Sequence, residues 1–207
     1  NYNDHHFHYG YFIYSSAILA MYDDDFANRY GGMVELLIKD IANISRTDTN
    51  FPYMRNFDVY EGHSWADGMG GSEISSYSDS INEESSSEAM NAWAAIYLWG
   101  MATNRTSYPN YANSDKNIKL GIWLYTNHYN SLRDYYLDVD SGDSQKEIYP
   151  SSLLNTYGNH GSIGVLFGGR GWYYVHWNPS PERPIINARE IKGIQILPVT
   201  PAMMYLG

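Results

Sequence analysis

Two kinds of hydrophobic pattern alternate along this chain, and they restrict its fold more than any other feature. Residues 9–22 are apolar on nearly every side of a helix, which is typical of a helix buried all round. Residues 26–44 repeat hydrophobic side chains every three or four positions and therefore predict an amphipathic helix. Residues 87–104 are again apolar on most faces, and residues 118–136 are again amphipathic. Buried and half-buried helices thus alternate.

This alternation is what two concentric shells of helices would produce, with a dry inner shell and a half-solvated outer one. We therefore predict a mainly α fold. Residues 45–83 lose the periodicity but keep aromatic side chains among Gly, Ser, Asn and Asp, which indicates a long functional loop rather than a linker. Residues 164–177 fit either a short hairpin or more helix and loop, and the pattern leaves that open.

Composition excludes several classes of function. The 207 residues carry 23 acidic and 13 basic side chains, a formal net charge of −10, so we expect neither nucleic acid nor an anionic membrane as a partner. There is no cysteine, which rules out disulfides and thiolate chemistry, and no uninterrupted apolar run of about eighteen residues. Aromatic residues make up 16%. Composition slightly favours a tyrosine-rich core over a groove that stacks on sugar rings.

Residues 4–10, "DHHFHYG", place one carboxylate and three histidines ahead of an apolar run. Asp4 and His8 are four apart and share a helix face once the helix has begun. His5, His6 and His8 do not match the spacing of helical metal ligands such as H-E-x-x-H, so we expect no metal site. The local pattern alone favours Asp4 as an N-cap with exposed histidines.

A second acidic cluster, "NEESSSEAMNAW", also has two interpretations. Glu84 and Glu88 are four apart, and paired carboxylates can serve general acid–base catalysis. Alternatively, Ser85 to Glu88 form a capping box, with Ser85 as N-cap and Glu88 bonding back to it. The local pattern favours the structural interpretation, although a carboxylate at a helix start can also line a cleft.

The segment "RNFDVYEGHSWADG" gathers acidic, histidine and aromatic side chains in a glycine-bounded loop. Loops held on a rigid scaffold commonly carry binding residues, whereas the alternative is a solvated acidic loop. Trp65 between polar residues favours the binding interpretation.

Four blocks of the sequence resemble glycoside hydrolase family 81, the endo-β-1,3-glucanases. They are "NDHHFHYGYF", "RNFDVYEGHSWADG", "ESSSEAMNAW" and "GIQILPVTPAMMYLG", and the resemblance spans essentially the whole chain. It implies endo-hydrolysis of internal β-1,3-glucosidic bonds with inversion at the anomeric carbon. It also implies that residues 1–207 are part of a single (α/α)6-type catalytic domain, a partial (α/α)6 toroid of two helix shells. We expect the family's N-terminal β-sandwich domain to be absent from this chain.

By this resemblance Asp4 corresponds to the general acid and Glu84 to the general base, while Glu88 and His8 match two further residues of the family's site. Glu83 departs from the pattern by adding a negative charge beside the base. The expected substrate-binding residues are Asp58, Tyr60, His63, Trp65 and Trp172, with Trp177 a further candidate for stacking on glucose.

Inversion requires a protonated carboxyl on one side of the scissile bond and an ionised carboxylate on the other, ~6.5–9.5 Å apart to admit a water. Asp4 would therefore have to keep its proton until it transfers it to the leaving oxygen. The expected partner is a β-1,3-glucan, with no cofactor, for a secreted or cell-wall protein that is monomeric unless missing segments complete it. The alternative is a non-catalytic glucan-binding fragment, because twelve helices of roughly 11–12 residues plus loops exceed 207 residues.

Overall fold

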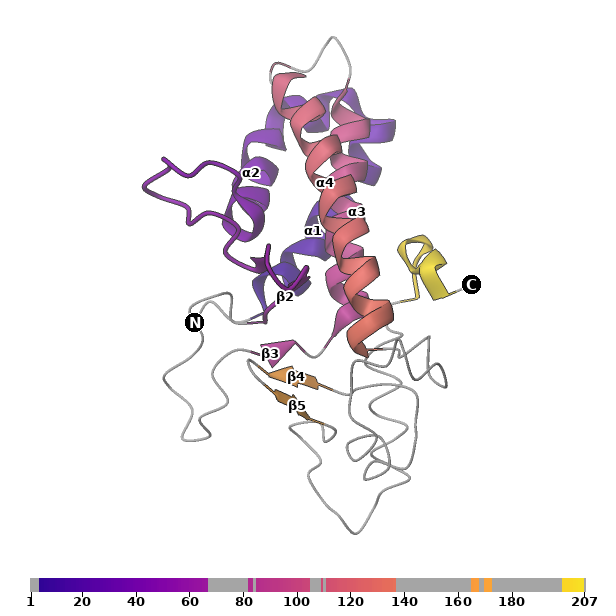
Figure 1. The fold of residues 1–207 in the computed structure, drawn as a ribbon. Helices are drawn as coiled ribbons and strands as arrows, with labels where there is room; N and C mark the ends of the chain where they lie inside the picture. The colour runs from indigo at the N-terminus through magenta and orange to yellow at the C-terminus, as the bar shows by residue number, and fades with distance from the viewer. Residues whose placement is uncertain are drawn as a thin grey trace.

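The computed structural model describes residues 4–66, 82–83, 85–104, 109, 111–136, 165–167, 170–172 and 199–206. Most of these residues belong to long helices that run side by side, as Figure 1 shows. The helices are α1 (His5–Tyr22), α2 (Asp24–Ala42), α3 (Ser86–Thr103) and α4 (Tyr111–Ser131), which continues into a π-helical turn, η1 (Leu132–Tyr136). The predicted mainly α fold is confirmed.

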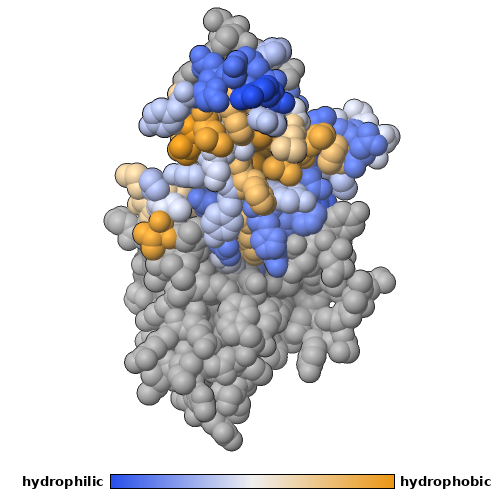
Figure 2. Space-filling view, turned by 180° about the vertical axis from the view of Figure 1, so that it is seen from behind, coloured by the Kyte–Doolittle hydropathy of each residue, from blue (hydrophilic) through white to orange (hydrophobic). Residues whose placement is uncertain are grey.

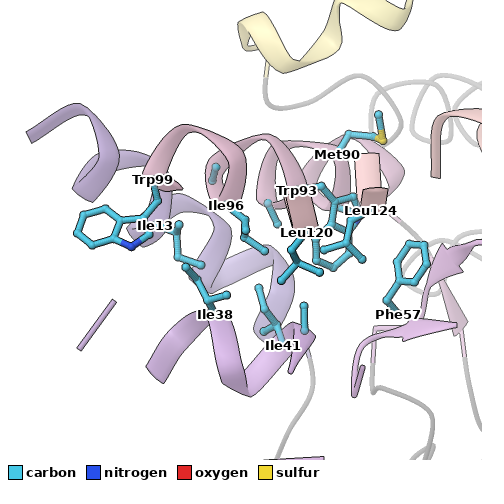
Figure 3. Close-up of a cluster of buried hydrophobic side chains, with 14 of the residues drawn as sticks. Ile13, Ile38, Ile41, Phe57, Met90, Trp93, Ile96, Trp99, Leu120 and Leu124 are labelled. Carbon is cyan, nitrogen blue, oxygen red and sulfur yellow. The ribbon is translucent and has the colours of Figure 1, made fainter. Parts of the chain in front are cut away.

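Helix α3 is the centre of the packing, because it contacts both α1 and α4, while α2 packs against α1. Thirteen of the eighteen α3 residues are buried, in keeping with the apolar pattern of residues 87–104. Trp93, Ile96 and Trp99 of α3 are completely buried (Figure 3). The same cluster takes in side chains from α1, α2 and α4, including Ile13, Ile38, Ile41, Leu120 and Leu124.

Two glycines allow the neighbouring helices to approach α3 closely. A Cβ added at Gly10 of α1 would lie 2.8 Å from the Cβ of Ala92 and 2.9 Å from its Cα. On the other side of α3, a Cβ at Gly121 of α4 would lie 2.5 Å from the backbone nitrogen of Tyr97. Neither site has room for a side chain, so both helix crossings depend on glycine.

The buried stripes of α2 and α4 are shifted from the hydrophobic repeats seen in the sequence. Met33 is 61% exposed whereas Val34 is buried, and Ile122 is 51% exposed whereas Leu124 is buried. In α4 the small Gly121 occupies the line of closest approach, so larger apolar residues move to the edges of the contact. Amphipathic helices were correctly predicted, but the predicted hydrophobic repeat was displaced by about one residue.

The prediction that residues 9–22 are buried all round is wrong. Ile13 and Ala17 of α1 are fully buried, but Phe12 is 62% and Leu19 50% exposed. The reason is that α1 meets α3 and α2 on only part of its surface. Seen from behind, hydrophobic surface gathers across the helical part of the molecule (Figure 2).

The described residues form two small antiparallel sheets, of which the one that contains β3, β4 and β5 lies below the helices in Figure 1. The first pairs β1 (Phe57–Asp58) with β2 (His63–Ser64). The second has the order β3 (Asn82–Glu83), β4 (Val165–Phe167) and β5 (Arg170–Trp172), with Glu83 opposite Leu166. Residues 164–177 therefore include a hairpin. A short 3₁₀ segment, η2 (Pro201–Leu206), packs against α3.

The crossing at Gly10 leads to a stability prediction. Alanine normally stabilises a helix interior by about 1 kcal/mol over glycine. At Gly10 the added methyl would meet the Ala92 backbone, so we expect Gly10→Ala to lower the free energy of unfolding by about 1–3 kcal/mol. Urea denaturation measures this, with Gly32→Ala in α2 as control because nothing lies within 4 Å of that position. Equal stability of the two variants would contradict the predicted close contact.

Candidate active site

Asp4 stands directly before α1 in an unusual backbone conformation. Its φ of 60° and ψ of 19° are left-handed, a region that aspartate tolerates better than most residues other than glycine. Its backbone N–H donates to the Ala66 carbonyl at 2.8 Å, and its carbonyl accepts from the His8 N–H at 3.0 Å. Asp4 is thus the N-cap by position, as the local pattern predicted, but its side chain makes no cap hydrogen bond. Its carboxyl is not committed to capping the helix.

His5 ties the start of α1 to α2. Its Nδ1 lies 2.6 Å from Oδ2 of Asp40 and 2.7 Å from Nη2 of Arg55. Arg55 approaches the same Asp40 carboxylate through Nη2 and donates from Nε to the Asp40 carbonyl at 2.9 Å. This group of His5, Asp40 and Arg55 joins α1, α2 and the following loop, and so holds the segment that carries Asp4.

His6 is completely buried and stacks on Trp93 of α3, with ring centroids 5.8 Å apart and the rings 12° from parallel. Burial, reinforced by the nearby charge of Arg55, lowers the pKa of His6 to about 3. Its Nε2 lies 3.6 Å from Oε2 of the equally buried Glu83. With that pKa His6 is neutral near pH 7, so its contact with Glu83 is not an ion pair there.

A second buried histidine, His128 of α4, also contacts Trp93. It accepts a hydrogen bond from Trp93 Nε1 at Nδ1, 2.8 Å away. Burial lowers the pKa of His128 well below its usual value, and the charges of His63 and His6 lower it further. Trp93 therefore contacts two buried, neutral histidines, one from α1 and one from α4.

The contact between His6 and Glu83 brings two distant parts of the sequence together. His6 is two residues after Asp4, and Glu83 in β3 is the residue before Glu84. Glu84 itself lies outside the described residues, so its pairing with Asp4 stays a prediction. The structure does show that the residues next to the predicted pair meet, because the buried side chains of His6 and Glu83 are in contact.

At the start of α3, Ser85 is the N-cap by position, and its carbonyl accepts from the Ala89 N–H at 3.1 Å. The predicted capping box does not form in the expected way, because the Ser85 side chain makes no cap hydrogen bond. Glu88 instead accepts at Oε1 from the hydroxyl of Tyr11 on α1, at 2.8 Å. Burial, and then this bond to Glu88, raise the pKa of Tyr11 well above its usual value.

Tyr11 is a site residue that sequence reasoning missed. It follows Asp4 by seven positions and His8 by three, which places all three on one face of α1. That spacing was the available signal, but Tyr11 belongs to an apolar run in which tyrosine resembles a core residue. His8 is exposed on the same helix.

The predicted binding residues of the loop stabilise one another. Trp65 is only 4% exposed and donates from Nε1 to Oδ2 of Asp58 at 3.0 Å, while Oδ1 accepts from the Tyr60 backbone at 2.9 Å. Burial opposes ionisation of Asp58, but these hydrogen bonds outweigh it and lower the pKa. His63 is buried with its ring against Trp65, whereas the Tyr60 side chain is 90% exposed. Their binding of glucan stays a prediction.

Trp172 closes β5, where its backbone pairs with Val165. Trp177 lies outside the described residues. In the part of the chain that the structure describes, no three His, Asp or Glu side chains gather in a way that could hold a metal ion. Nor does any helix there combine the length and hydrophobicity that crossing a membrane requires.

Comparison with known proteins assigns this chain to a family. Residues 1–206 match the family model described as the glycosyl hydrolase family 81 C-terminal domain. The chain belongs to this family. The predicted resemblance to glycoside hydrolase family 81 is thereby confirmed.

Relatives within family 81 cover nearly the whole chain. A glucan endo-1,3-beta-D-glucosidase of Acetivibrio thermocellus is 45% identical over 99% of this chain and 23% of its own length. The primary septum glucan endo-1,3-beta-D-glucosidase of Schizosaccharomyces pombe is 32% identical over 99% of this chain and 17% of its own. The chain thus spans about a quarter, or less, of the length of these relatives.

A solved structure of family 81 supports the same fold. It is a glutamate-to-alanine variant from Clostridium thermocellum, 43% identical, with a TM-score of 0.76 over 99% of this chain and 24% of that one. The mainly α arrangement is therefore shared with a family member. Completion of an (α/α)6 toroid around the present helices stays a proposal.

The buried histidine beneath this family 81 site leads to a pH prediction. His6 takes up a proton near pH 6.5 when unfolded but near pH 3 when folded, so stability falls as the pH drops from 6.5 to 3. Between pH 7 and pH 4 the free energy of unfolding should decrease in both proteins. We expect the decrease to be smaller in His6→Gln than in the unaltered protein, by on the order of 3 kcal/mol. Urea denaturation at both pH values measures this, with the exposed His8→Gln as control. Equal losses in His6→Gln and the unaltered protein would contradict the burial of a neutral His6.

Proposed function

We propose that this chain supplies the acid–base centre for endo-hydrolysis of β-1,3-glucosidic bonds in β-1,3-glucans. The observation that carries the proposal is the meeting of the start of α1 with the start of α3. His6 contacts Glu83 at 3.6 Å, and Tyr11 bonds Glu88 at 2.8 Å. Residues about eighty positions apart in the sequence are therefore in contact. One of the two segments carries Asp4 and the other carries Glu84, and glycoside hydrolysis requires such a pair of carboxyl groups.

In the proposed mechanism, Asp4 gives its proton to the oxygen of the leaving sugar. Glu84, ionised, takes a proton from a water that attacks the anomeric carbon from the opposite face, which inverts its configuration. Asp4 suits the acid role because its backbone is fixed to Ala66 and its side chain does not cap α1. His8, one turn further along α1, orients the Asp4 carboxyl or bonds a sugar hydroxyl.

Support from outside the site comes from the names of the relatives and from the charge of this chain. The relatives from Acetivibrio thermocellus and Schizosaccharomyces pombe are both named as glucan endo-1,3-beta-D-glucosidases. A net charge of −10 is compatible with an uncharged polysaccharide and disfavours a polyanionic one. We also propose an extracellular or cell-wall location, in keeping with the primary septum named for the fission yeast relative.

For the domain organisation, we propose that residues 1–207 belong to a single (α/α)6-type catalytic domain. The Acetivibrio relative is about four times longer than its match to this chain, which is enough to supply further helices. The exposed apolar side chains Phe12 and Leu19 on α1 are the surface that such helices would cover.

One observation favours a second candidate, a fragment that binds glucan without cleaving it. The chain spans only 23% of the Acetivibrio relative, so part of the cleft could reside in other segments. Affinity electrophoresis in laminarin, run beside a reducing-sugar assay, separates the two functions. Turnover by the unaltered protein supports the hydrolase, and retardation without turnover supports the binding fragment.

The acid–base assignment predicts that Asp4→Asn and Glu84→Gln each lower laminarin hydrolysis by at least about 10²-fold. Each variant keeps the shape of its side chain and removes one protonation step. Release of laminari-oligosaccharides measures the rate, and urea denaturation checks that the variants are folded. Asp134→Asn, on the exposed side of η1, is the matched control and should keep full activity. Full activity in either site variant would refute that assignment.

A further inference from the structure

The hydrogen bond from Tyr11 to Glu88 joins residues 77 positions apart and lies at the edge of the candidate site rather than in the core. Tyr11 is 41% exposed and Glu88 is partly exposed. A bond in this position adds little to a hydrophobic core, so its presence calls for another reason. Neither of the local sequence patterns considered for Glu88, the paired carboxylates and the capping box, includes Tyr11.

The helix crossing fixes the geometry of this bond. Gly10, the neighbour of Tyr11, lies against the backbone of Ala92, and Glu88 is one turn before Ala92 on α3. Because this contact leaves no room for a side chain, α1 and α3 cannot shift much relative to one another. The hydroxyl of Tyr11, on a ring with only two rotatable bonds, is therefore presented to Glu88 at a set position.

The same face of α1 carries the proposed catalytic acid. Asp4, His8 and Tyr11 follow each other at helical spacing, so Tyr11 lies one turn beyond His8 and two beyond Asp4. Glu88 likewise lies one turn into α3 beyond the segment that carries Glu84. The bond thus fastens the two carboxylate-bearing helices to each other beside the proposed site of cleavage.

We infer that Tyr11 is a positioning residue that holds the Glu88 carboxylate so that its second oxygen, Oε2, faces a glucose hydroxyl or the attacking water. This role rests on the glucan-hydrolase function proposed above. Tyr11 donates to Oε1 and fixes the plane of the carboxylate without touching the reacting atoms. The raised pKa of Tyr11 keeps its hydroxyl protonated, and therefore a donor, throughout the neutral range.

The test is a double-mutant cycle in laminarin hydrolysis with Tyr11→Phe, Glu88→Ala and the combined variant. We expect Tyr11→Phe to lower kcat by roughly 10-fold and to change KM by less than about 2-fold, because an oriented carboxylate matters most in the transition state. In the Glu88→Ala background the same change should have an effect of less than about 2-fold, since the two residues act as a unit. Tyr22→Phe, on α1 and 88% exposed, is the matched control and should retain both constants.

Three results would overturn the inference. Unaltered kcat in Tyr11→Phe, with or without a loss of urea stability, would mean that the bond has only a structural role. A full 10-fold loss in the Glu88→Ala background would mean that Tyr11 acts independently of Glu88. Absence of turnover by the unaltered protein would defeat the proposed function and this inference together, which separates that failure from the first two.

Discussion

The close crossing of α1 and α3 at Gly10 and Ala92 is the contact on which the rest of the structure depends. It sets the distance between the helix that begins after Asp4 and the helix that begins after Ser85. A side chain larger than hydrogen at position 10 would separate the two helices. The contact from His6 to Glu83 and the hydrogen bond from Tyr11 to Glu88 both connect α1 to the segment around the start of α3.

Around the junction, polar groups are buried in an arrangement that favours precision over stability. Burying His6, His128 and Glu83 carries a desolvation cost, and neutrality of the histidines reduces it. Trp93 connects this layer to the core by stacking on His6 and donating to His128. Such buried polar contacts allow fewer alternative packings than apolar ones, which suits the proposed acid–base pair, whose carboxyl groups must be held at a defined separation.

Much of the fold could be predicted because its signals are local or are shared across a family. Helical periodicity located the helices, and long sequence blocks identified the family. The buried face of each helix was harder to predict, because at α4 it is decided by Gly121, a residue without a hydrophobic side chain. The burial of α1 was overestimated, since an apolar sequence cannot report how many neighbours a helix has among the described residues.

The site was predictable only in part for a similar reason. Asp4 and Glu88 were assigned to the site from the family resemblance, and that assignment stays a prediction, whereas both helix starts were placed correctly by capping patterns. The hydrogen bonds were not, since Glu88 bonds a tyrosine 77 positions away rather than the backbone three residues before it. Pairings between distant helices depend on the crossing geometry, which no local pattern contains.

The anomeric form of the first product tests the central claim of an inverting acid–base pair most directly. Proton NMR during hydrolysis of a laminari-oligosaccharide records the new reducing end before it equilibrates. The account predicts that the α-anomer forms first, because a single displacement by water inverts the β-linkage. Initial formation of the β-anomer would contradict it, since retention requires a covalent intermediate and carboxyl groups only ~5–5.5 Å apart.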